Sequence, residues 1–178
     1  MKKLILTVFI SVLTITSTFA QRYAFVDTEY ILENIAEYRD AQDELDELSL
    51  GWQQEIEAKY QEIEQMYKAY QAEAVLLPEE TKNKRQDAII NREKEVKNLQ
   101  KKYFGTDGDL FKKRQELIKP IQDKVFNAVE EIATEGNYAF VLDKAGSVSV
   151  LYLDSKHDKS DEILEHLGYR PGAIKTNK

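Results

Sequence analysis

An α+β fold with a small β body and a long helical hairpin arm is predicted by three observations. Short strand-like segments stand near both ends of the chain, and a long stretch of helical periodicity separates them. The two halves of that stretch carry opposite charge. Oppositely charged neighbouring segments attract when they lie side by side, so the chain is expected to double back as an antiparallel coiled coil.

The strand segments are Arg22–Asp27 and Tyr138–Asp143, whose sequences RYAFVD and YAFVLD nearly repeat each other. Both are short, aromatic and β-branched, which is typical of strands. A third segment, Ser147–Asp154, alternates Val148, Val150 and Tyr152 with other residues. A tight turn at residues 144–146 would join it to the second segment, which predicts a β hairpin.

The outgoing helix is predicted from about Tyr38 to Leu77 by a single apolar stripe. Its members recur every three or four residues: Leu45, Leu48, Trp52, Ile56, Tyr60, Ile63, Tyr67, Tyr70, Ala74 and Leu77. Such a narrow stripe is typical of a seam for one partner helix rather than the broad face of a globular core. At ~1.5 Å per residue this helix would be roughly 60 Å long.

The returning helix follows a break at Leu76–Thr81, where Pro78 suits the first turn of a new helix. Its stripe consists of Ile89, Val96, Leu99, Tyr103, Leu117, Ile121, Val125, Ala128 and Ile132. Gly105 and Gly108 would each cost about 1 kcal/mol relative to alanine in a helix interior, and Pro120 removes a backbone hydrogen bond. We therefore predict a hinge at the two glycines, a kink near Pro120, and a more stable helix when both glycines become alanine.

The N-terminus has the pattern of a secretory signal peptide. Lys2 and Lys3 precede an apolar run from Leu4 to Ile15, and Thr18–Ala20 places small residues where a signal peptidase reads. A run of roughly 12 residues is too short for a membrane anchor, which needs about 20, so cleavage before Gln21 is expected. The chain has no cysteine, so packing and oligomerisation rather than disulfides must stabilise the exported protein.

These features predict an order of five segments. They are a signal peptide (1–20), a first strand with the entry to the body (21–37), the hairpin arm (38–120), the helix end with the β hairpin and a closing helix (121–169), and a tail (170–178).

Charge is segregated along the arm. Residues 27–80 contain 16 acidic and 3 basic side chains, whereas residues 81–124 contain 13 basic and 7 acidic ones. The basic stretches Lys101–Lys102 and Lys112–Arg114 could bind nucleic acid or anionic lipid. Pairing with the acidic outgoing helix explains them more simply, and export argues against nucleic acid as the working partner.

No enzyme, cofactor or metal site is predicted. The sequence has neither a GxxxxGK phosphate loop nor a GxGxxG motif. His157 lies beside Asp154 and Asp158, but His166 belongs to the expected closing helix, so a solvated surface histidine is the simpler interpretation. The Glu-rich outgoing helix offers paired carboxylates, but a two-helix arm provides no shielded pocket in which they could act as acid and base.

Contact with other polypeptides is the chemistry that the aromatic side chains offer. Trp52, Tyr60, Tyr67 and Tyr70 lie on the stripe, so packing in the seam is the simpler interpretation. A row of amphipathic rings with exposed edges would also suit weak contact with varied unfolded chains. These four residues are the candidate client contacts.

The order of these elements resembles the Skp/OmpH family of periplasmic chaperones. The resemblance covers the whole mature chain and is carried by the signal peptide, the Ala24–Asp27 strand, the helical hairpin, Tyr138–Asp143, Val150–Tyr152 and the closing Asp158–Leu164 helix. It implies a jellyfish-shaped homotrimer whose arms enclose a cavity. It also implies that the protein holds unfolded outer-membrane proteins in the periplasm without ATP or any cofactor.

One departure from the family concerns charge. Its better-known members are strongly basic, whereas this chain has a sequence pI near 5.0, so its clients and any weak contact with membrane surfaces are expected to differ. A coiled-coil envelope scaffold or spacer is the alternative function, because it would share the signal, the arm and the charge pattern. A scaffold needs a sticky tip or a second folded end, whereas the tip of this arm is expected to be only Leu76–Pro78.

Overall fold

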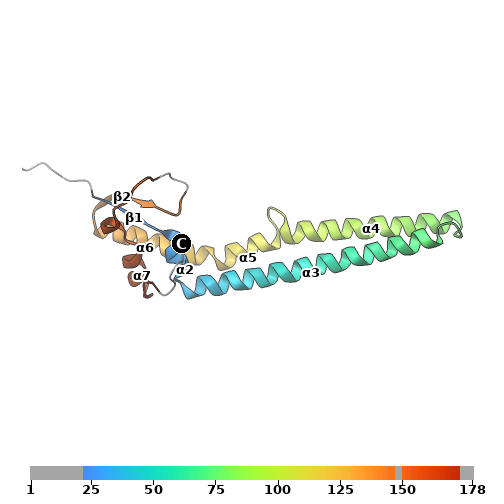
Figure 1. The fold of residues 1–178 in the computed structure, drawn as a ribbon, viewed down its shortest axis with the longest axis horizontal. Helices are drawn as coiled ribbons and strands as arrows, with labels where there is room; N and C mark the ends of the chain where they lie inside the picture. Colours follow the sequence, from blue (N-terminus) through green and yellow to red (C-terminus); the bar gives the residue numbers. More distant parts are fainter. Residues whose placement is uncertain (1–21, 147–149, 173–178) are drawn as a thin grey trace, which may run out of the picture. The chain divides into compact units, whose positions relative to one another are not determined.

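The computed structural model describes residues 22–146 and 150–172. The helices and strands are β1 (Arg22–Val26), α2 (Thr28–Glu33), α3 (Ala36–Glu73), α4 (Glu79–Phe104), α5 (Asp109–Leu117), α6 (Lys119–Glu135), β2 (Tyr138–Asp143), the 3-10 turn η1 (Ser155–His157) and α7 (Ser160–His166) (Figure 1). They divide into two compact units, an arm (residues 32–124) and a body that holds the remainder. The expected signal peptide, residues 1–20, lies outside the described residues.

The sheet of the body consists of β1 and β2, which pair in parallel. Tyr23 is the register partner of Phe140, and Val26 that of Asp143. Parallel strands need a crossover connection, usually a helix, because a tight turn cannot join them. Here the connection is more than a hundred residues long and contains the entire arm. The two near-repeat segments of the sequence are therefore partners in one sheet.

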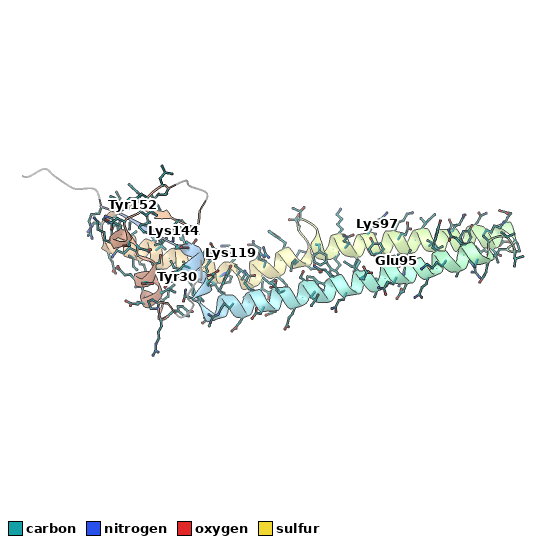
Figure 2. The ribbon with its side chains drawn as sticks, viewed as in Figure 1. Tyr30, Glu95, Lys97, Lys119, Lys144 and Tyr152 are labelled. Atoms are coloured by element: carbon teal, nitrogen blue, oxygen red, sulfur yellow. The ribbon has the colours of Figure 1, made fainter. Side chains whose placement is uncertain are left out.

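The predicted β hairpin is wrong for the part of it that the structure describes. Residues 147–149 lie outside the described part, and residues 150–154 form no strand. The side chains of Leu151 and Tyr152 are fully and largely exposed instead, at 101% and 81% (Tyr152 is labelled in Figure 2). The alternating pattern indicated extended chain with two different faces, but alternation alone does not select a pairing partner, and β2 pairs with β1.

Apolar side chains from both ends of the chain are buried in the body. They are Ala24, Phe25, Val26, Ile31, Val125, Ala128, Ile132, Ile163 and Leu164. Those of α6 recur at three- and four-residue steps, which keeps them on one face of that helix. The closing helix predicted near Ser160 is present as α7, and Gly168 follows it with a φ of 86°, the left-handed geometry that commonly ends a helix.

Polar groups join the strand ends of the body to its helices. The Asp27 N–H donates to Ser160 Oγ at 2.8 Å, and the Asp27 carboxylate accepts from the Tyr30 N–H at 3.0 Å. Thr28 donates to Asp143 through both its N–H (3.2 Å) and its hydroxyl (2.7 Å). The aspartates that end both near-repeat segments thus accept hydrogen bonds at the start of α2. N–H groups in the first turn of a helix have no partner within the helix, so these carboxylates cap it.

The helical hairpin of the arm is confirmed, with small shifts in its bounds. α3 spans 38 residues, or about 57 Å at 1.5 Å per residue. α4 begins directly after Pro78, at the expected break. Figure 1 shows α3 running beside α4 and α5, and Figure 2 shows side chains along the outer sides of both helices.

The returning side of the arm is interrupted, so that it consists of separate helices rather than one weakened helix. Gly105 ends α4 and Gly108 precedes α5, so neither glycine lies inside a helix, and the loop between them stands out in Figure 1. A second break lies at Ile118, between α5 and α6, where Pro120 cannot supply a helical N–H. The expectation that alanine would stabilise this region is wrong, because a Cβ at Gly105 would lie 2.4 Å from the Lys101 carbonyl oxygen and one at Gly108 would lie 2.7 Å from that of Tyr103.

Gly51 is a glycine that does lie inside a helix, and it provides a matched control. A Cβ at Gly51 would meet nothing within 4 Å. We expect Gly51→Ala to raise the free energy of unfolding by up to about 1 kcal/mol, since alanine is the better helix former. Gly105→Ala and Gly108→Ala should each lower it by about 1–3 kcal/mol through steric overlap. Urea unfolding followed by circular dichroism measures all three, and stabilisation by either loop substitution would contradict this account.

Candidate functional site

The seam of the arm is formed by two clusters of buried side chains. Ile56 and Ile63 of α3 pack with Ile89 and Val96 of α4, and partly buried Met66, Tyr70, Leu99, Tyr103 and Phe104 surround them. A second cluster joins Ala41 and Leu45 to Ile118. The seam is therefore apolar and narrow, and it leaves most of the surface of each helix in solvent.

Cross-helix contacts fix how the hairpin is aligned. Trp52 stacks on Tyr103 with ring centroids 4.7 Å apart. Further along α3, Glu62 pairs with Arg92 at 2.6 Å and Glu73 pairs with Arg85 at 2.8 Å. As the residue number rises on α3 it falls on α4, so these contacts act as rungs of one ladder. The acidic outgoing helix thus meets the basic returning helix as the charge pattern predicted.

The ion pairs of the ladder lie at the surface. The hydrogen bond from Arg92 lowers the pKa of the Glu62 carboxyl, while hydrogen bonds to Glu62 and Glu95 raise the pKa of Arg92. Both groups therefore stay charged over the physiological pH range. Because solvent and salt screen exposed pairs, they align the helices more than they stabilise them.

An aromatic cluster stands where α4 ends. Trp52 lies flat against Tyr103 and meets Phe104 edge-on at 6.2 Å. The Tyr103 hydroxyl donates to Glu55 at 2.8 Å, and this hydrogen bond, with burial, raises the pKa of the tyrosine. The cluster anchors the last turn of α4 beside the Gly105 break.

The four candidate contact residues fall into two classes. Trp52 and Tyr70 are half-buried and belong to the seam. Tyr60 and Tyr67 are exposed, at 37% and 51%. They are seven residues apart, or two helical turns, so they share one flank of α3.

The flank that carries Tyr60 and Tyr67 is not the flank of the ion pairs. At about 100° per residue, the two tyrosines lie on one side of the line through Ile56 and Ile63, and Glu62 lies on the other side. Among the four candidates, these two tyrosines offer the most exposed ring surface to another chain.

Several exposed apolar side chains of the arm were not among the predicted contact residues. Val75 and Leu76, at the turn between α3 and α4, are 90% and 87% exposed, and Leu50, Ile90 and Phe111 are about half exposed. Leu50, Ile90 and Phe111 are absent from both predicted stripes, and that absence was the available signal for exposure. The turn was interpreted as a helix break and as too small a tip for a scaffold.

The two histidines of the chain lie apart, each against a different partner. His157 packs its ring 4.6 Å from that of Tyr23, and His166 contacts Glu131 at 2.8 Å. Within residues 22–146 and 150–172, no three His, Asp or Glu side chains gather in a way that could hold a metal ion. No helix in that same part of the chain is both long enough and apolar enough to cross a membrane.

Alanine substitutions in the two classes of aromatic residue should change the free energy of unfolding by different amounts. Trp52→Ala removes the Tyr103 stacking contact and should lower the free energy of unfolding by about 1–3 kcal/mol. Tyr67→Ala removes a mostly exposed ring and should change it by no more than about 0.5 kcal/mol. Urea unfolding followed by far-UV circular dichroism compares the two variants. Equal losses would show that Tyr67 is also part of the seam.

The comparisons with known proteins cover both units. A family model described as "Outer membrane protein (OmpH-like)" matches residues 22–167, from β1 to just past α7. A relative from Aquifex aeolicus (strain VF5), described as an uncharacterized protein, is 30% identical over 150 residues, which cover 84% of this chain and 88% of the relative. These findings confirm the resemblance drawn from the order of elements. The chain belongs to the OmpH-like outer membrane protein family.

Proposed function

We propose that this chain is an ATP-independent holding chaperone that binds unfolded outer-membrane proteins and prevents their aggregation. The observation that carries the proposal is the apolar surface of the arm. Tyr60 and Tyr67 stand exposed along one flank of α3, at 37% and 51%. A surface of scattered, small apolar contacts suits varied unfolded chains, because several weak contacts to one client add through high effective concentration.

The periplasm is the proposed compartment. Membership of the OmpH-like family and the signal-peptide pattern of the N-terminus both support it. Unfolded outer-membrane proteins cross this compartment, and the cell provides no ATP there. Holding them needs neither catalysis nor a cofactor, since burial of apolar client surface provides the driving force.

A homotrimer is the proposed assembly, with three antiparallel coiled-coil arms around one client. Within the described residues, the sheet has only two strands, and its β2 carries a half-exposed Phe140. Leu151 and Tyr152, also in the body, are exposed as well. Open strand edges and apolar patches of this kind are usually covered by another chain, and a second and third copy would cover them here.

Holding should be measurable by dilution of a urea-unfolded outer-membrane barrel protein into buffer with and without the purified chaperone. We expect the chaperone to suppress light scattering equally with ATP, with EDTA and with neither, because the contacts are apolar. Tyr60→Ala and Tyr67→Ala should each weaken suppression modestly and should weaken it severely when combined. Trp52→Ala is the control variant, because it destabilises the seam of the arm and leaves both exposed tyrosines in place.

The salt dependence of the same assay distinguishes apolar from charged client contacts. Suppression should fall only moderately by about 0.3 M salt, because screening acts on the charged fraction of the contacts. A steep loss over that range would show that charge dominates client binding. Dependence on ATP or EDTA would overturn the cofactor-free mechanism.

Oligomerisation through the body gives a separate prediction. Leu151→Asp combined with Tyr152→Asp would place charge in the proposed interface and should shift the protein from trimer toward monomer. Tyr67→Asp, on the arm, is the matched control and should leave the trimer intact. Analytical ultracentrifugation measures both. A monomeric unmodified protein, or a trimer lost only with the arm substitution, would contradict assembly through the body.

The exposed tip favours a second candidate function, a coiled-coil envelope scaffold, because Val75 and Leu76 provide the sticky end that such a spacer needs. A double substitution, Val75→Ser with Leu76→Ser, separates the candidates. A holding chaperone should keep most of its suppression of client scattering, whereas a spacer would lose its attachment to the surface that its tip binds.

A further inference from the structure

We infer that a groove on the ion-pair flank of the arm binds the apolar side chains of an extended client segment. The groove lies between α3 and α4, holds about 290 Å³ and is lined by Met66, Ala69, Arg85, Ala88 and Ile89. This inference rests on the proposed holding function and adds to it a binding site with a defined shape.

Small residues on both helices create the groove. Ala69 and Ala88 are short and exposed, so neither fills the space between the helices. Met66 and Ile89 form an apolar floor that belongs to the buried seam. The volume lies near the lower limit of ligand pockets, which run from about 300 to 1,000 Å³, so it suits one or two amino-acid side chains.

An ion pair stands on either side of the groove along the arm. Glu73–Arg85 lies toward the tip at 2.8 Å, and Glu62–Arg92 lies toward the other end at 2.6 Å. Arg85 donates to Glu73, and Arg92 donates to both Glu62 and Glu95. Each guanidinium has five N–H donors, so both arginines keep donors that the carbonyl oxygens of a bound peptide can accept from. The groove therefore has an apolar centre and hydrogen-bond donors at both ends.

The spacing of the two pairs fits an extended chain. Glu62 and Glu73 are eleven residues apart on α3, which is about 16 Å at 1.5 Å per residue. An extended segment of about five residues covers that length at ~3.3 Å each. Alternate side chains of such a segment point to one face, and membrane-spanning β-strands alternate apolar with polar residues. The alternating strand of an unfolded barrel protein is thus the occupant that the groove fits best.

Charged substitutions test the groove with a close control on the same helix. Ala69→Glu and Ala69→Lys place a long charged side chain in the groove. Ala58→Glu and Ala58→Lys make the same changes at another exposed alanine of α3, which also has a glutamate four residues later. All four variants introduce good helix formers, so circular dichroism should show an unchanged arm.

The probe is a fluorescent decapeptide of alternating leucine and threonine, with an all-threonine decapeptide as the comparison. Fluorescence anisotropy should show binding of the alternating peptide to the unmodified full-length protein. Both Ala69 variants should weaken it about tenfold, the loss expected when one aliphatic side chain is no longer buried, and both Ala58 variants should leave it unchanged.

Three results would overturn the groove as a client site. They are no preference for the alternating peptide, equal affinities in all four variants, or a change of oligomeric state confined to the Ala69 variants, which would identify the groove as a contact between copies of this chain. The holding assay keeps the two proposals distinct. If the unmodified protein suppresses aggregation of the barrel protein while the peptide does not distinguish the variants, the groove is wrong and the holding function stands.

Discussion

The parallel pairing of β1 with β2 is the constraint on which the rest of the chain depends. Parallel strands cannot be joined by a tight turn, so the connection between them must be long. In this protein that connection is a complete helical hairpin, inserted between two strands of nearly identical sequence. Asp27, directly after β1, and Asp143, the last residue of β2, accept hydrogen bonds from N–H groups in the first turn of α2. The same six-residue pattern therefore encodes a strand and a carboxylate that caps a helix.

The arm is held by far less apolar contact than a globular unit of its length. One narrow seam carries the buried residues, and the ion pairs at its edge align α3 with α4 while contributing little stability at the surface. A hairpin built this way leaves two long flanks in solvent. Its exposed surface is a direct result of the narrowness of its seam, and exposed surface is required of a protein that binds other chains.

The two flanks differ in chemistry. One presents Tyr60 and Tyr67, whose rings offer broad apolar area with a polar edge. The other alternates ion pairs with the groove beside Ala69 and Ala88. Aromatic contact tolerates many partners, whereas a groove bounded by hydrogen-bond donors favours extended backbone. Under the proposed holding function, the two flanks would let one arm accept unrelated sequences that share an unfolded, alternating character.

The sequence by itself determined the helical hairpin, the seam, the attraction between its halves and the family. Local spacing predicts the hairpin and the seam, since apolar residues at three- and four-residue steps must share a helix face. The attraction follows from segregated charge, and the family from the resemblance in the order of elements. Only the tertiary structure decided the rest. It paired β2 with β1 rather than with residues 150–154, placed Gly105 and Gly108 outside the helices, and separated the half-buried Trp52 from the exposed Tyr67. The physical reason is that periodicity specifies which residues share a face, whereas strand partners, loop sterics and the exposure of a ring at the edge of a seam depend on residues distant in the sequence.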